Sequence, residues 1–250
     1  MWRATIAILF AAWAAGQDDA LFISPDFIVE GRVVKGVPYS AQAVTSVRQT
    51  LSTGSEILTQ MTAMVARDAD GRTRREQTIQ TIGPWAVERP SGEMPSVILI
   101  QDPLKQLNYM LNARTHVARV TRQNIAPPME ERRGAEVDRR REEEQRRASE
   151  RPLPKAEPLG TRTIEGVAAQ GKRTTTTLGR GDVGNNSPIQ IVVETWYSPE
   201  LQVVVLGKRN DPRIGEITYK LVSIKRGDPP ASLFEIPADY RIDGNVERRK

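Results

Sequence analysis

The feature that most limits the fold of this chain is a set of long segments in which apolar and polar residues alternate. In residues 37–51, VPYSAQAVTSVRQTL, Ala41 and Ala43 fall on one side of the chain and Gln42 and Ser46 fall on the other. This period of two residues is typical of a β-strand with one buried face. A strand of this length spans about 50 Å, and antiparallel sheets of such strands twist and curl. We therefore expect a mainly β fold built on one long, curved antiparallel sheet.

Further segments of the same kind follow, separated by turn sequences rich in glycine, aspartate and asparagine. They are residues 56–67, 72–82, 97–100, 107–111, 116–120, 160–178, 189–197, 201–206 and 216–224. The pair Glu165-Gly166 divides one of them into a hairpin. Near the end, residues 231–240 follow two prolines and carry four large apolar or aromatic side chains, Leu233, Phe234, Ile236 and Tyr240. We expect this segment to dock those side chains on the sheet.

One strongly charged segment interrupts the strands. Residues 130–151 contain eight acidic residues and eight arginines, and several opposite charges are four residues apart, as in Glu136 and Arg140. That spacing favours a helix, but there is almost no apolar face to pack it. We expect residues 130–158 to be a solvated insert, partly helical or disordered. It would separate the first part of the sheet, residues 17–129, from the second, residues 159–242, and residues 243–250 would form a disordered tail.

The N-terminus predicts export. Arg3 precedes an apolar run of about a dozen residues and then small residues, which is the pattern of a secretory signal over residues 1–16. The run is shorter than the roughly 20 residues that a membrane-spanning helix needs. Because the chain has no cysteine, it has neither a lipid attachment site nor disulfides, and its core alone has to stabilise it. We expect a mature protein of the periplasm or the extracellular space, without a stable membrane span.

The charge distribution argues against nucleic acid as a partner. The formal net charge is +5, but the most highly charged segment is balanced and contains no aromatic residue. Binding to phosphates requires excess positive charge on one face, and binding to single strands adds stacking aromatics. We therefore expect no nucleic-acid partner.

Few residues are available for catalysis or for binding a metal. His116 is the single histidine, and in a strand over residues 116–120 it would share a face with Ala118 and Val120, as a packed or rim histidine does. The sequence DADG at 68–71 resembles the start of a calcium loop, but Ile79 stands where the loop requires glutamate. The sequence also shows no pair of carboxylates flanked by aromatic residues, the pattern that would suggest a glycosidase. We predict no catalytic residue, no metal and no cofactor, and hence a protein that is not an enzyme.

The hairpin ETWYSPELQVVVL, residues 194–206, is apolar on both sides. Trp196 and Tyr197 point to opposite faces, and alternation would put Val204 and Leu206 together on one face. A strand that is apolar on both sides is covered twice or lines something apolar. The candidate ligand-lining residues are Met61, Met64, Tyr109, Trp196, Val204 and Leu206.

A group of arginines stands at the start of the segment DGRTRREQ. Arg72, Arg74 and Arg75 are candidate anion contacts. On an exposed face these arginines would contribute to the solubility of the protein. On a concave face, Arg75 would meet an anionic head group or the carboxylate of a partner.

Several stretches carry a resemblance to known proteins. ETWYSPELQVVVL, DPRIGEITYKL and RGDPPASLFEIPADY, with the earlier VPYSAQAV and DGRTRREQ, resemble an uncharacterised family of secreted bacterial proteins. More distantly, the order of strands, the hairpin at Gly166 and the F-x-I-P tail are similar to the LolA and RseB group of lipoprotein carriers and sigma-factor regulators. That resemblance implies an open half-barrel whose sheet cradles an apolar cavity.

Together these features predict an exported binding protein of the cell envelope. It would hold an apolar or amphiphilic ligand, such as a lipid, or a lipidated polypeptide in the concave face of the half-barrel. The alternative is a protein-interaction or sensor module that uses the charged insert to contact an envelope protein and binds no small ligand.

Overall fold

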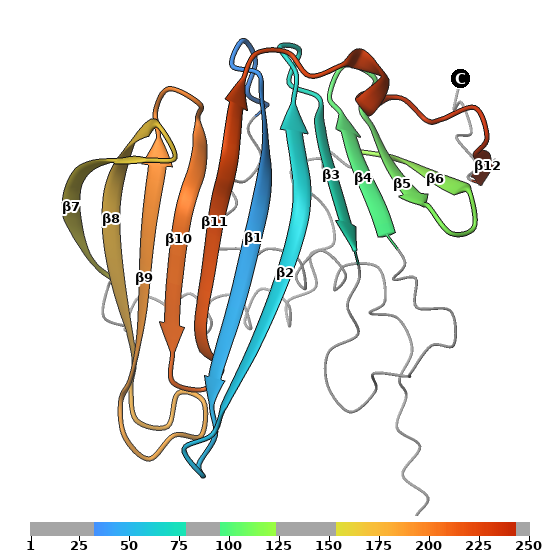
Figure 1. Ribbon diagram of the computed structural model, residues 1–250. Helices are drawn as coiled ribbons and strands as arrows, with labels where there is room; N and C mark the ends of the chain where they lie inside the picture. Colours follow the sequence, from blue (N-terminus) through green and yellow to red (C-terminus); the bar gives the residue numbers. More distant parts are fainter. Residues whose placement is uncertain (1–32, 79–95, 124–153, 244–250) are drawn as a thin grey trace, which may run out of the picture.

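A computed structural model describes residues 33–78, 96–123 and 154–243, and these form one twelve-stranded sheet (Figure 1). The strands are β1 (Tyr39–Thr50), β2 (Glu56–Arg67), β3 (Thr73–Thr78), β4 (Ser96–Asp102), β5 (Leu107–Asn112), β6 (Val117–Arg122), β7 (Lys155–Ile164), β8 (Val167–Leu178), β9 (Ile189–Ser198), β10 (Val203–Asp211), β11 (Gly215–Arg226) and β12 (Arg241–Asp243), and a 3₁₀-helix η3 (Ala231–Phe234) precedes β12. The spatial order is β12-β6-β5-β4-β3-β2-β1-β11-β10-β9-β8-β7.

The sheet is open, because β12 and β7 form its two edges and do not pair with each other. All neighbouring strands are antiparallel except β12, which runs parallel to β6. The longest pairing is at the centre, where β1 and β2 are paired along their full length from Tyr39 and Arg67 to Thr50 and Glu56. The predicted fold class, a mainly β protein with one open, curved antiparallel sheet, is confirmed.

Two features differ from the sequence prediction. Strand β7 begins at Lys155, so residues 155–158 belong to the sheet and not to the insert. Pro158 is tolerated there because β7 is an edge strand, and the register shifts between Pro158 and Gly160. Strand β12 was not predicted; it has three exposed residues and carries no alternation. The expected signal segment 1–16, the charged residues 130–151 and the tail 244–250 lie outside the described residues.

The pairing register divides the side chains between two faces, because residues directly opposite each other in neighbouring strands lie on the same face. We define face A as the face that carries Tyr39, Ala41, Ala43 and Thr45 of β1, and face B as the other. From Tyr39 to Ser46 of β1, the residues of face A are buried and those of face B are half-buried. The predicted alternation of this strand is confirmed.

Two apolar clusters stabilise the sheet. One gathers residues from β1, β2 and β7–β11, including Trp196, Val167 and Leu221. The other lies on face B of β4, β5 and β6 and includes Ile100, Leu111 and the 2% exposed Phe234 of η3. Leu233, Ile236 and Tyr240 pack against this second cluster. The predicted docking of residues 231–240 on the sheet is therefore confirmed.

Trp196 shows how closely the sheet packs at its β7 end. It lies opposite Gly171 of β8, and the guanidinium carbon of Arg162 is 3.8 Å from the centre of its ring. A Cβ atom on Gly171 would lie 2.7 Å from two carbons of the Trp196 ring and 2.8 Å from the Cβ of Leu159. The absence of a side chain at Gly171 makes room for the indole.

We expect Gly171→Ala to lower the free energy of unfolding by about 1–3 kcal/mol, because the indole has to move out of a well-packed site. Urea denaturation of the two proteins measures the difference. Gly179→Ala is the matched control, since a Cβ there meets Asp182 no closer than 3.4 Å, and its change stays within about 0.5 kcal/mol. Equal stability of both variants and the parent would contradict the packing of Trp196 on Gly171.

Candidate functional site

The six candidate lining residues do not share one face. Met61 pairs with Thr45, and Val204 pairs with Tyr197, which places both on face A. The other four, Met64, Tyr109, Trp196 and Leu206, lie on face B. Met61 and Met64 are three residues apart in one strand, so their side chains necessarily point to opposite sides.

The expectation that Val204 and Leu206 share a face is wrong. Val204 is opposite Tyr197 and Leu206 is opposite Trp196, so one extra residue of β10 is accommodated between two consecutive residues of β9. Such a β-bulge reverses the alternation beyond it. Trp196 and Tyr197 do point to opposite faces, as predicted.

Three of the four candidates on face B are buried by described parts of the chain. Tyr109 belongs to the cluster that contains Phe234. Trp196 and Leu206 pack with Ile164 and Val167 at the tip of the β7–β8 hairpin. Met64 is 55% exposed. Packing within the described chain thus accounts for the burial of Tyr109, Trp196 and Leu206.

The tip of the β7–β8 hairpin is held against β11 by two hydrogen bonds. Glu165 accepts a hydrogen bond of 2.7 Å from Lys220, and the carbonyl of Gly166 accepts one of 3.0 Å from Arg226. Arg226 also pairs with Glu200 at 2.5 Å. These contacts fold the hairpin over Trp196 and Leu206.

Face A has a different character at the centre of the sheet. We call Ala41, Ala43, Thr45, Met61 and Ala63 the face A strip; all are buried, with exposures of 1–8%. The described strands form a single layer here, each packed against its neighbours in the sheet. Four of the five side chains are small, and all five are shielded from solvent.

A group of buried and half-buried polar side chains borders the face A strip. We call Tyr39, Arg67, Arg75, Gln77 and Tyr219 the arginine–tyrosine cluster. Tyr39 pairs with Arg67, and the Arg67 guanidinium carbon lies 4.9 Å from the centre of the Tyr39 ring. Tyr39, Arg67, Gln77 and Tyr219 are at most 8% exposed. Face A therefore combines small side chains with buried hydrogen-bonding groups.

The two arginines of this cluster bind neutral oxygens. Arg67 donates to the carbonyl of Val37, at 2.9 Å, and to the carbonyl of Leu201. Arg75 donates through Nε and an Nη to Oε1 of Gln77, at 3.0 and 2.9 Å. These acceptors satisfy donors but carry no negative charge.

Burial shifts the titration of this cluster. Desolvation lowers the pKa of Arg67 and of Arg75, and desolvation raises the pKa of Tyr39 and of Tyr219. Arginine remains protonated in proteins even so. The cluster therefore presents positive guanidinium groups among neutral phenols at neutral pH.

The three candidate anion contacts are divided between the faces as well. Arg74 lies opposite Ile100 on face B and donates to the carbonyl of Leu233 at 2.9 Å and to Glu76 at 2.8 Å. Arg72 pairs with Asp68 at 2.5 Å, and its guanidinium carbon lies 5.1 Å from the ring centre of Phe234. Of the three, only Arg75 lies on face A, opposite Val65.

We call residues 229–243 the strap. Arg74 and Arg72 hold its first half through Leu233 and Phe234. Its second half is held at His116, whose carbonyl accepts a 2.8 Å hydrogen bond from the backbone N–H of Arg241. Figure 1 shows the strap passing in front of β4 and β5 and ending beside β6. It covers the apolar cluster on face B at this end of the sheet.

His116 has a role that its expected place in a strand does not suggest. It lies in the β5–β6 turn with φ +51°, so the expected strand face shared with Ala118 and Val120 is wrong. Its Nδ1 is 2.8 Å from Asp239, and its ring stacks on Tyr240 with centroids 5.1 Å apart. These contacts fasten the strap.

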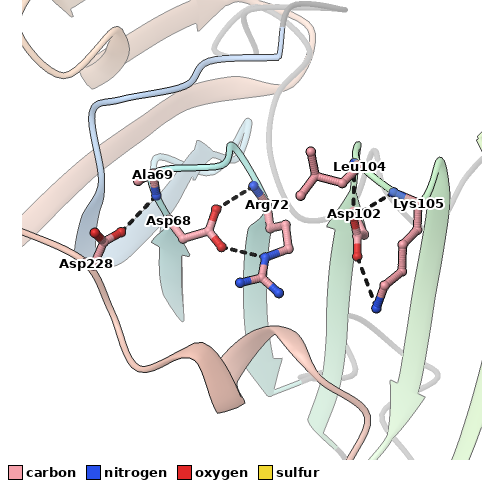
Figure 2. A network of polar contacts seen from close by, with 7 residues as sticks. All are labelled: Asp68, Ala69, Arg72, Asp102, Leu104, Lys105 and Asp228. Carbon is pink, nitrogen blue, oxygen red and sulfur yellow. Dashed lines mark hydrogen bonds and ion pairs between the residues drawn. The ribbon is translucent and has the colours of Figure 1, made fainter.

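Three aspartates accept hydrogen bonds from backbone N–H groups of turns (Figure 2). Asp68 accepts from the backbone N–H of Arg72 at 2.8 Å, and Asp228 accepts from the N–H of Ala69 at 2.9 Å. Asp102 accepts from the N–H groups of Leu104 and Lys105, both at 3.0 Å. Within residues 33–78, 96–123 and 154–243, no group of three or more histidine, aspartate or glutamate side chains is placed to hold a metal ion.

Sequence reasoning missed Tyr39, Arg67, Gln77 and Tyr219. Of these four, Arg67 was the easiest to predict from the sequence. It continues the alternation of Met61, Ala63 and Val65, and a charged residue on an apolar face is unusual. The positions of Tyr39 and Tyr219 next to the arginines depend on strand register and could not be read locally.

No protein-family model matches the chain, and no curated protein sequence matches it. Solved structures do match. An uncharacterized conserved protein from Thermus thermophilus is 10% identical, with a TM-score of 0.42, over 84% of this chain and 91% of that one. The MucA/MucB complex of Pseudomonas aeruginosa gives 9% identity and a TM-score of 0.42 over 84% of this chain and 59% of that one.

A putative outer membrane lipoprotein-sorting protein domain from Vibrio parahaemolyticus also matches, at 6% identity and a TM-score of 0.27 over 78% of this chain and 88% of that one. Likenesses of this size identify no ligand and no reaction. Among the described residues, no helix is both long enough and apolar enough to span a bilayer.

Phe234→Ala tests whether the strap is part of the core. We expect it to lower the free energy of unfolding by about 3–5 kcal/mol, because a large side chain that is 2% exposed leaves a cavity on face B. Met64→Ala, which truncates a 55% exposed side chain, changes stability by at most about 0.5 kcal/mol. Thermal and urea unfolding measure both; a loss below about 1 kcal/mol for Phe234→Ala would show that the strap is not core.

Proposed function

We propose that this chain is an exported, non-enzymatic binding protein of the cell envelope. It holds an apolar or amphiphilic ligand, free or as the lipid of a lipidated polypeptide, against face A of the open half-barrel. The first residues, with the pattern of a secretory signal, support export.

The observation that carries this proposal is the composition of face A. Along β2 this face presents Met61, Ala63 and Val65 and then Arg67, so it changes from apolar to cationic over six residues, or about 20 Å. Ligand sites of small molecules are mostly apolar surfaces with a few placed polar groups. Face A has this composition in side chains that are shielded from solvent, and the hairpin and the strap cover both ends of face B.

Of the six lining candidates, Met61 and Val204 remain as proposed contacts, because they lie on face A. The proposal uses none of the four candidates on face B. It adds Ala43 and Ala63, which lie between Met61 and the arginine–tyrosine cluster on the same face.

The test begins with the protein exported and purified under mild conditions. Native mass spectrometry, followed by extraction into organic solvent, shows whether an apolar molecule travels with it. We expect a bound mass near one equivalent in the wild type. Met61→Lys should lose it, because an ammonium group in the face A strip is incompatible with an apolar ligand.

Met64→Lys is the matched control, since it places the same charge three residues along the same strand but on face B. It should keep the ligand, and circular dichroism should show that both variants are folded. A wild-type protein that carries nothing and takes up neither oleate nor oleyl alcohol would contradict the proposal. The charged residues 130–151 would then be the place to look for a protein partner.

A further inference from the structure

We infer that one end of the sheet is a membrane-docking surface, where aliphatic side chains on three neighbouring turns enter the headgroup region of a zwitterionic phospholipid bilayer. We call this end, residues 48–58, 179–188 and 210–216, the turn end. The inference goes beyond the proposed function and requires no ligand on face A.

The strand register brings the three turns to the same end of the sheet. One row of paired residues crosses six strands, from β2 through β1, β11, β10 and β9 to β8: Leu58, Arg48, Glu216, Asn210, Val192 and Thr175. Beyond this row the chain makes the β1–β2, β10–β11 and β8–β9 turns, which Figure 1 shows at the lower end of the sheet. Neighbouring strands lie about 4.8 Å apart, so the row spans about 24 Å.

Large apolar side chains are exposed at the turn end. Ten such side chains are exposed in the described chain, and five of them lie here, with exposures of 40–63%: Leu51, Ile57, Leu58, Val183 and Ile214. Leu51, Val183 and Ile214 belong to three different turns. Exposed apolar side chains that gather in one place are typical of protein-binding or membrane-binding surfaces.

Each of the three turns also carries an exposed arginine, one to three residues before its aliphatic residue. These are Arg48, Arg180 and Arg213. A guanidinium group beside an aliphatic side chain suits a phospholipid surface, because the first can bind a phosphate and the second can enter the acyl boundary. Arg213 is held by Asp211 at 2.7 Å, so Arg48 and Arg180 are the proposed phosphate contacts.

The net charge of the turn end favours a zwitterionic surface. Four acidic residues accompany the three arginines, so the formal net charge is 3 − 4 = −1; they are Glu56, Asp182, Asp211 and Glu216. A nearly neutral surface gains little from a strongly charged partner. Apolar contact therefore supplies most of the proposed binding.

The arrangement fits a fluid surface better than a protein partner. The aliphatic side chains stand on three separate turns, with serine, threonine, glycine and asparagine between them. A protein interface concentrates its apolar contacts in one packed centre, whereas lipids rearrange around separate side chains. Because irregular backbone does not occur exposed to hydrocarbon, only side chains enter, to the depth of the headgroups.

Flotation of the exported, purified protein with phosphatidylcholine vesicles tests the inference. We expect the wild type to bind. The combined variant Leu51→Ser, Val183→Ser and Ile214→Ser, with one change in each turn, should bind at least about tenfold more weakly, because it removes apolar area from the contact. Raising the salt to about 0.5 M should change the affinity by less than about threefold.

The matched control changes three apolar side chains that are similarly exposed elsewhere, Leu104→Ser, Met110→Ser and Ile242→Ser, which are 39–59% exposed in the parent. It should bind vesicles as the wild type does. Met61→Lys should also bind them, because Met61 lies outside the turn end, and this separates vesicle binding from the ligand on face A. Circular dichroism shows whether each variant is folded.

A second measurement does not depend on the combined variant. The chain has no cysteine, so one introduced cysteine can carry an environment-sensitive nitrobenzoxadiazole dye. The dye on Ile214→Cys should emit at a shorter wavelength when vesicles are added, because it enters a less polar layer. The dye on Leu104→Cys, in the β4–β5 turn at the opposite end of β4, should show no shift.

The outcomes separate this inference from the alternatives. No binding to phosphatidylcholine vesicles, or an equal loss in the two combined variants, would overturn it. Binding that requires phosphatidylglycerol and disappears at high salt would also overturn it, since charge would then carry the contact. Dimerisation in sedimentation experiments that the turn-end variant abolishes would assign this end to a second copy of the chain instead. A wild type that binds vesicles but neither oleate nor oleyl alcohol would support the inference and contradict the proposed function.

Discussion

The rest of the structure depends on the register between β1 and its two neighbours, β2 and β11. Because side chains alternate in a strand, a slip of one residue in either pairing would exchange the two faces of the sheet centre. The register places Ala43 between Ala63 and Leu221, and Thr45 between Met61 and Tyr219. Those pairs put the small residues and the buried tyrosine on one face.

The two faces are then used in different ways. Face B is covered at each end by the chain itself: the β7–β8 hairpin packs on Trp196, and the strap packs on Tyr109. The contacts that hold these covers are long-range hydrogen bonds and ion pairs, such as Arg74 to Leu233 and Lys220 to Glu165. Face A carries the face A strip and the arginine–tyrosine cluster, and it is the face to which the proposal assigns the ligand.

Much of the fold could be predicted from the sequence, because strand periodicity and turn chemistry are local. The boundaries of β2 and the hairpin turn at Glu165-Gly166 were predicted correctly, and so was the docking of Phe234. The bulge in β10 was not, since it depends on how two strands fit together. The left-handed conformation of His116 was not either, since it accompanies contacts with Asp239 and Tyr240 more than a hundred residues away.

The candidate site could be predicted only in part. Met61 and Met64 were grouped although their spacing alone assigns them to opposite faces. Arg72 and Arg74 were offered as anion contacts, but their partners, Asp68, Glu76 and the strap, come from a packing arrangement that no local pattern shows. For Arg75 the sequence left open an exposed face and a concave face, and in the structure it lies on face A, opposite Val65.

The central claim is that face A holds the ligand, and photolabelling tests it most directly. A fatty acid with a diazirine in the middle of its chain would be bound to the protein and activated by light, and the labelled peptides would be mapped by mass spectrometry. Labels at Met61, Thr45 and Val204 are the predicted result. Labels at Trp196, Tyr109 or Met64, with face A unmodified, would contradict it.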